Sequence, residues 1–157
     1  YVEYGAADIG IIGKDVLLEE ARNVYELVDL NFGLCRLMLA VPEALQREKL
    51  SDYAHLRVAT KYPRVAEQFF LDNGIQMEII KLNGSIELAP MVGLAVKIVG
   101  IVETGRTLKE NRLIEVAHLH RATARFIANR ESKKMKFERI QSMVDEMNRL
   151  LKGEALE

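Results

Sequence analysis

The sequence predicts an α/β fold with largely parallel sheets. Short apolar runs alternate along the chain with segments of helical periodicity, and glycine, proline or asparagine separate them. One long amphipathic helix closes the pattern near the C-terminus. The 157 residues, 49% hydrophobic and 29% charged, suffice for one domain or two small lobes with a real core.

The strands are expected in short apolar runs that end at turn residues. Glycines bound the first run, and Pro42 stops the second. The segment 114–129 is read as one or two strands. The other expected strands are 7–13, 34–41, 56–60, 77–82 and 98–102.

The helices are expected between these strands. A short one follows the first strand over 14–22, and another covers 64–73, where Asn73-Gly74 ends it. Ser85 is a plausible N-cap for 86–95, and Pro90 makes that helix short or kinked. The segment 43–55 is polar and is read as a helix or a loop. The clearest helix is 133–152, whose apolar face we expect to dock on a sheet through Phe137, Ile140, Met143, Val144, Met147, Leu150 and Leu151.

Composition excludes several classes of protein. The net charge is −1, from 22 basic and 23 acidic residues, which does not support non-specific nucleic-acid binding. Cys35 is the only cysteine, so no disulfide forms within the chain, and a buried thiol in a reducing cytoplasm is expected. No apolar run approaches the roughly 18 residues of a membrane span, and no signal peptide is recognised. The chain opens on Tyr1 in structured sequence, so we expect a natural N-terminal portion to be missing.

Residues 98–108 (IVGIVETGRTL) are the most informative stretch. An apolar strand ends in an acid, and a Thr-Gly-x-Thr turn opens into a helix start. Gly105 lets the backbone approach an anion, which first-turn N–H groups and the helix dipole then face. Thr104 and Thr107 add hydroxyls, Arg106 adds a cation, and Glu103 can accept from sugar hydroxyls. The stretch predicts a phosphosugar site, although plain strand–helix connections share the same order of residues.

Two further loops follow expected strands. In parallel sheets, loops at the carboxyl ends of strands lie together and can surround one ligand-binding site. Lys61 offers a point charge for a phosphate, or is a solvated lysine before a turn. Gly84-Ser85 is a second candidate anion site, or a simple helix cap. Glu87 can hold a sugar hydroxyl or a metal, or only stabilise a helix dipole.

Other polar positions carry weaker signals. Asp8 precedes a strand and either binds a ligand or caps a turn. His118 and His120 share one side of a strand, and a structural or surface role is preferred over a metal site. The sequence contains no Ser/His/Asp arrangement, Walker loop or GxGxxG motif worth defending.

Taken together, several segments resemble the short form of the ATP phosphoribosyltransferase family of histidine biosynthesis. They follow one consistent order along nearly the whole chain. The matching stretches are 7–15 (ADIGIIGKD), 57–63 (RVATKYP), 82–90 (LNGSIELAP), 101–108 (IVETGRTL) and, more loosely, 123–130 (TARFIANR).

The resemblance implies a two-lobed fold like the type II periplasmic binding proteins. Residues 1–41 and 115–157 would form one lobe, and 42–114 the lobe that carries the phosphoribosyl loop. The implied reaction joins the 5-phosphoribosyl group of phosphoribosyl pyrophosphate to N1 of ATP and releases pyrophosphate, with Mg²⁺ present. A homodimer and a histidyl-tRNA-synthetase-like regulatory subunit are the implied partners.

Carried over to this chain, the resemblance assigns substrate contacts rather than a single catalytic residue. Lys61, Gly84 and Ser85 would face the pyrophosphate. Ribose or nucleotide contacts would come from Glu87, Asp8 and Thr60. The 5-phosphate and ribose would be cradled by Glu103, Thr104, Gly105, Arg106, Thr107 and Leu108.

The chain departs from the family pattern at a few positions. The family has acids where Val96 and Gly100 stand and a small residue where Arg112 stands, and its basic N-terminal Lys-Gly-Arg segment does not precede Tyr1. Loss of a carboxylate at Gly100 bears on ribose or magnesium handling. Two alternatives therefore stay open, a non-catalytic ligand-binding module on the same fold and an assembly subunit that docks a regulatory partner.

Overall fold

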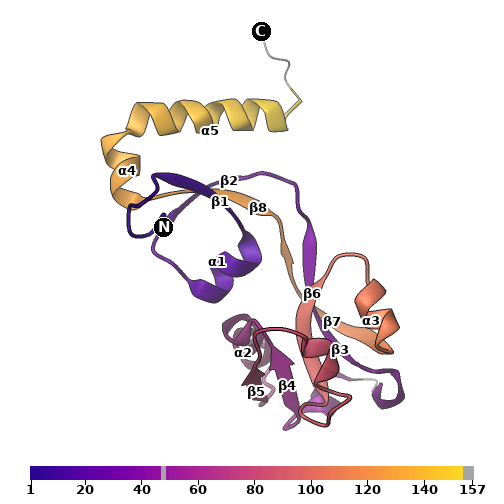
Figure 1. The fold of residues 1–157 in the computed structure, drawn as a ribbon. Coiled ribbons are helices and arrows are strands. Elements are labelled where there is room, and N and C mark those ends of the chain that lie inside the picture. The colour runs from indigo at the N-terminus through magenta and orange to yellow at the C-terminus, as the bar shows by residue number, and fades with distance from the viewer. Residues whose placement is uncertain (47–48, 154–157) are drawn as a thin grey trace. The chain divides into compact units, whose positions relative to one another are not determined.

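Two units, each with its own sheet, make up the chain (Figure 1). The computed structural model describes residues 1–46 and 49–153. The first unit combines Tyr1–Leu34 with Ala122–Glu157, and the second is Cys35–Arg121. The sequence placed the lobe boundaries at 41/42 and 114/115. The units divide elsewhere because strands β3 (Cys35–Pro42) and β7 (Leu113–Ala122) belong to the sheet of the second unit.

The second unit contains a five-stranded sheet in the order β5-β4-β6-β3-β7. Strand β4 (Arg57–Thr60) pairs in parallel with β5 (Glu78–Lys81) and with β6 (Lys97–Val102), whereas β3 runs antiparallel to β6. The sheet is therefore mixed, with both parallel and antiparallel pairs of strands. The predicted α/β fold class is confirmed. Because parallel neighbours end on one side, the loops after β4, β5 and β6 all leave from the same edge.

Helical segments cover both faces of this sheet. Alternate residues of β6 point to opposite faces, so Val99 packs with Phe70 of α2 (Pro63–Asp72) on one side. On the other side, Ile98 packs with Leu108 of α3 (Arg106–Glu110). The short 3₁₀ turn η3 (Ile86–Leu88) also packs on this second face.

The first unit contains a three-stranded antiparallel sheet in the order β1-β8-β2. Its strands are β1 (Ile9–Gly13), β8 (Ala124–Ala128) and β2 (Tyr25–Asp29). Figure 1 shows α5 (Phe137–Leu151) along one side of this sheet and α1 (Lys14–Glu20) on the other. Val144 of α5 packs against Val28 and Phe126, which confirms the expected docking of that helix.

The expected strands and helices are confirmed to within a few residues, except at three places. Strand β2 was not predicted at all. The C-terminal helix begins earlier than expected and is divided at Lys136 into α4 (Arg130–Met135) and α5. Its start is set by Asn129, whose side chain accepts from the amides of Glu131 and Ser132.

The helix expected over 86–95 was wrong beyond its first turn. Only Ile86–Leu88 is helical in this segment, and turns follow through Gly93. Ser85 does not act as a side-chain cap, because its backbone is left-handed with φ of 48° and its hydroxyl makes no cap bond. The polar segment before β4 contains two short 3₁₀ turns, η1 (Glu43–Leu45) and η2 (Leu50–Tyr53), and residues 47 and 48 lie outside the described part.

The described helices are too short or too polar for one to cross a bilayer.

Candidate active site

The turn between β6 and α3 has the geometry of an anion cradle. Gly105 precedes the helix with φ of 76° and ψ of 0°, a left-handed conformation that glycine adopts without steric cost. Leu108, one turn into α3, is buried in the core and anchors the helix. The chain therefore leaves a buried strand, reverses at Gly105 and presents the first amides of a helix.

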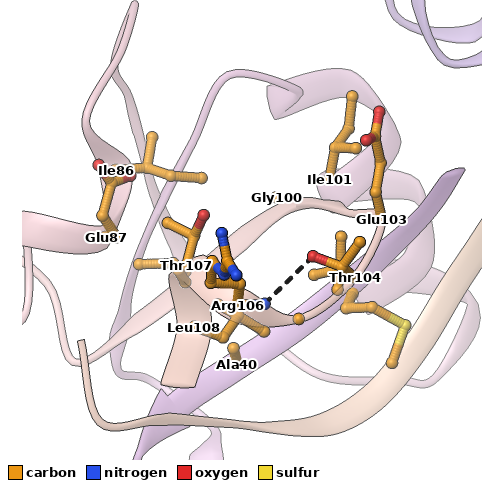
Figure 2. Close-up of a pocket in the computed structure, with 14 residues that line it drawn as sticks. Ala40, Ile86, Glu87, Gly100, Ile101, Glu103, Thr104, Arg106, Thr107 and Leu108 are labelled. Carbon is orange, nitrogen blue, oxygen red and sulfur yellow. Dashed lines mark hydrogen bonds between the residues drawn. The ribbon is translucent and has the colours of Figure 1, made fainter. Parts of the chain in front are cut away.

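Most amides of this turn are not used within the described part of the chain. The amide of Arg106 donates weakly to Thr104 Oγ1 at 3.4 Å (Figure 2). Gly105, Thr107 and Leu108 donate no amide hydrogen bond to any described residue. Free first-turn amides attract anions because they carry the positive end of the helix dipole.

A pocket of about 250 Å³ opens beside this turn in the second unit (Figure 2). Ile86 and Glu87 line one side, and Glu103 and Thr104 lie on the opposite side. The remaining polar lining is Gly105, Arg106 and Thr107. The other lining residues are mostly apolar and come from β3, β6 and α3, namely Met38, Ala40, Ile98, Gly100, Ile101, Val102 and Leu108.

The pocket combines polar groups of both signs near its opening. Arg106 supplies a guanidinium, Thr104 and Thr107 supply hydroxyls, and all three are exposed. Glu103 is exposed and Glu87 is half-buried. An anion fits the amide and hydroxyl groups, and sugar hydroxyls fit the carboxylates. In the described residues, no group of three His, Cys, Asp or Glu side chains gathers to hold a metal by itself.

The other predicted site residues lie outside this pocket. Lys61, Gly84 and Ser85 are exposed in the loops after β4 and β5, which leave the same edge of the sheet as the Gly105 turn. Thr60 is fully buried, and its hydroxyl donates to the Val99 carbonyl at 2.7 Å.

Asp8 belongs to the first unit, where it joins β1 to α4. Lys136 Nζ lies 2.6 Å from one carboxylate oxygen of Asp8, and Ser132 Oγ donates to the other at 2.7 Å. These two donors, with Lys136 the stronger, hold the pKa of Asp8 below its ordinary value.

The sequence analysis did not predict an ion pair that lies next to the Gly105 turn. Arg36 of β3 donates to both carboxylate oxygens of Glu115 of β7, at 3.0 and 3.2 Å. Glu115 Oε1 also lies 3.9 Å from the position a Cβ on Gly105 would take. The pair links two strands far apart in the sequence, so only the sheet order reveals it. The apolar residues of β3 that line the pocket, Met38 and Ala40, were missed for the same reason.

The chain has an α/β fold like that of the periplasmic binding proteins, and a glycine turn with mostly unused amides, among the residues described, lines a pocket of its second unit. A solved substrate-binding protein of an amino acid ABC transporter shares the fold with a TM-score of 0.66 at 16% identity, over 98% of this chain and 69% of that one. At this identity the likeness concerns the fold alone.

The chain belongs to the ATP phosphoribosyltransferase family, which catalyses the first step of histidine biosynthesis. The family model, HisG, matches residues 1–149. The ATP phosphoribosyltransferase of Syntrophomonas wolfei is 54% identical over 98% of this chain and 70% of its own length. A solved ATP phosphoribosyl transferase from Thermotoga maritima, in a HisG:HisZ complex, is 34% identical with a TM-score of 0.82 and covers 98% of this chain and 74% of that one.

Proposed function

We propose that this chain binds phosphoribosyl pyrophosphate at the Gly105 turn and transfers its phosphoribosyl group to N1 of ATP, with release of pyrophosphate. The observation that carries the proposal is the group of amides and hydroxyls around Gly105, at the end of a buried strand, of which the Gly105, Thr107 and Leu108 amides donate to no residue that the structure describes. A phosphate monoester matches these donors in charge and in hydrogen-bonding capacity.

The remaining substrate groups are assigned to residues around the same edge of the sheet. Glu103 and Glu87 line the pocket and would accept from ribose hydroxyls. Lys61 and the Gly84-Ser85 turn would face the pyrophosphate, whose Mg²⁺ arrives with the substrate. Asp8 and Thr60 remain proposed nucleotide or ribose contacts. To bind substrate, Asp8 would have to give up its contact with Lys136, and Thr60 its hydrogen bond to the Val99 carbonyl.

The proposed catalysis relies on placement rather than on a covalent intermediate. Two polyanions must be brought together, and the charge of the leaving pyrophosphate must be neutralised. Backbone amides fixed by the fold suit this task because they do not have to reorganise when charge develops.

The proposed assembly is a homodimer with a regulatory partner subunit. Support for such a partner comes from the HisG:HisZ complex of the Thermotoga maritima relative. The proposed location is the cytoplasm, consistent with a single cysteine that cannot form a disulfide within the chain. The second unit is proposed as the phosphoribosyl-binding lobe.

The test is an absorbance assay for phosphoribosyl-ATP with ATP, phosphoribosyl pyrophosphate and Mg²⁺, with and without partner extract. We expect product from the wild-type chain. A Thr104→Ala/Thr107→Ala variant should bind phosphosugar more weakly by about 1–3 kcal/mol, because it loses two hydroxyl donors to a charged group. Unchanged affinity in that variant would count against the cradle.

A non-catalytic phosphosugar-binding module is the second candidate function. Gly100 favours it, because the strand that enters the cradle lacks the carboxylate expected from the family pattern. Saturable phosphosugar binding without turnover would support this reading. Binding of a partner without either ligand would instead indicate an assembly subunit.

A further inference from the structure

We propose that Ile86 and Gly100 together form an apolar wall on one side of the pocket and thereby set its selectivity for pentose over hexose phosphates. The inference rests on the proposed function, since it concerns the same phosphosugar site. Both residues line the pocket, but they come from different elements, the η3 turn and strand β6.

The two residues fit each other closely. Gly100 is buried in β6, and a Cβ placed on it would lie 2.6 Å from Ile86 Cδ1. Real Cβ atoms do not approach other carbons so closely, so Ile86 occupies the space that a side chain at position 100 would need. The apolar wall on this side of the pocket is therefore an isoleucine methyl group packed against the backbone of Gly100.

Backbone contacts hold Ile86 in this position. The amide of Leu88 donates to the Ser85 carbonyl at 3.1 Å, and the amide of Ala89 donates to the Ile86 carbonyl at 3.0 Å. Ala89 is buried in the same core cluster against which Ile86 packs. The turn that carries Ile86 is thus attached to the core, and a ligand cannot displace the whole turn without disturbing that packing.

This arrangement limits how far a sugar extends from the anion turn. Glu87 directly follows Ile86, so the carboxylate that would accept from ring hydroxyls is carried by the same short turn. A phosphate at the Gly105 turn leaves the sugar ring in a pocket of about 250 Å³. The extra carbon and hydroxyl of a hexose phosphate would meet the apolar wall, where the hydroxyl finds no hydrogen-bond partner.

Calorimetric titrations with ribose 5-phosphate and glucose 6-phosphate test the proposal. We expect the wild-type chain to prefer ribose 5-phosphate. Ile86→Ala should reduce that preference on the order of tenfold, because it removes most of the wall. In Ile86→Ala/Gly100→Ala the new methyl group no longer meets Cδ1 and refills part of the gap, so part of the preference should return.

Ile80→Ala is the matched control, because it makes the same truncation in β5 at a half-buried position that does not line the pocket. It should leave the preference ratio at the wild-type value. An unchanged ratio in Ile86→Ala, with ribose 5-phosphate still bound by the wild type, would overturn this inference alone. Binding of neither sugar phosphate by the wild type would overturn the proposed function and the inference with it.

Discussion

The hydroxyl of Thr60 is shared between two backbone groups, donating to the carbonyl of Val99 at 2.7 Å and accepting from the amide of Tyr62 at 2.9 Å. Thr60 is the last residue of β4, and its exposed fraction is 0%. This one side chain ties the end of β4 to β6, the strand that leads into the Gly105 turn. The contact holds the start of the loop after β4 against the neighbouring strand β6.

We expect Thr60→Val to destabilise the protein by about 1–3 kcal/mol. The variant keeps the shape of the side chain but removes a buried hydroxyl that pairs with two backbone groups. Urea unfolding followed by circular dichroism measures the loss. Thr60→Ser, which keeps the hydroxyl, should lose clearly less, and equal losses in the two variants would contradict the role of the hydrogen bonds.

Gly105→Ala should lower both stability and phosphosugar affinity. An alanine at φ of 76° costs about 1 kcal/mol in the left-handed region, and any relaxation moves the amides proposed to face the phosphate. Gly74→Ala is the control, because Gly74 has φ of 66° at the end of α2 and does not line the pocket. The control should lose similar stability while ribose 5-phosphate affinity stays unchanged. Equal affinity losses in both variants would argue against a special role for the Gly105 turn.

Lys97 should make the stability depend on pH in the alkaline range. Its exposed fraction is 0%, and burial lowers the pKa of its ammonium from 10.5 to about 8. Between pH 8 and 10.5 the unfolded chain therefore binds a proton that the folded chain does not, so the free energy of unfolding rises with pH across that window. The rise attributable to Lys97 is on the order of 3 kcal/mol.

Unfolding curves of the wild type and of Lys97→Met at pH 7.5 and 10.5 isolate this effect. The difference in stability between the two proteins should shift in favour of the wild type as the pH rises. Lys81→Met, at an exposed position of β5, provides the matched control and should show no such shift. A constant difference between wild type and Lys97→Met would show that the buried amine does not titrate in this range.

Gly100→Asp should raise kcat/KM about tenfold, equivalent to roughly 1.4 kcal/mol of transition-state stabilisation, if the missing carboxylate limits activity. The side chain needs Ile86 Cδ1 to rotate away, since that methyl lies 2.6 Å from the new Cβ position. We expect the accompanying loss of stability to be about 1 kcal/mol. Steady-state kinetics with ATP and phosphoribosyl pyrophosphate measure the gain, and Gly100→Asn separates charge from size. No gain would mean that Glu103 or Glu87 suffices.

The parts of the site that are local in sequence could be predicted from it. The apolar run of β6, the glycine at position 105 and the helix start of α3 are adjacent in the chain, and each has a clear residue signature. Strand β2 was missed because its edge position and its register shift between Glu26 and Val28 leave a weak alternation. Ser85 has the residue type of an N-cap, but its left-handed backbone depends on the tertiary packing of η3.

Contacts between distant segments could not be read from the sequence. The fit of Ile86 against Gly100 depends on how η3 lies on β6, and the pairing of Arg36 with Glu115 depends on β3 lying next to β7. Lys97 looks like an ordinary charged residue, and only the packing around it reveals a buried amine. The hydrophobic pattern of the sequence therefore predicts the strands and helices. The lining of the pocket depends on how those strands and helices pack together, which the pattern does not show.

The most direct test of the account is an amide NMR titration of the chain with ribose 5-phosphate, using ribose as the control without phosphate. We predict large, saturable shifts of the Gly105, Arg106, Thr107 and Leu108 amides with the phosphate ester and small shifts with ribose. Saturable binding that leaves these four amides unmoved would contradict the claim that the turn after β6 holds the phosphate.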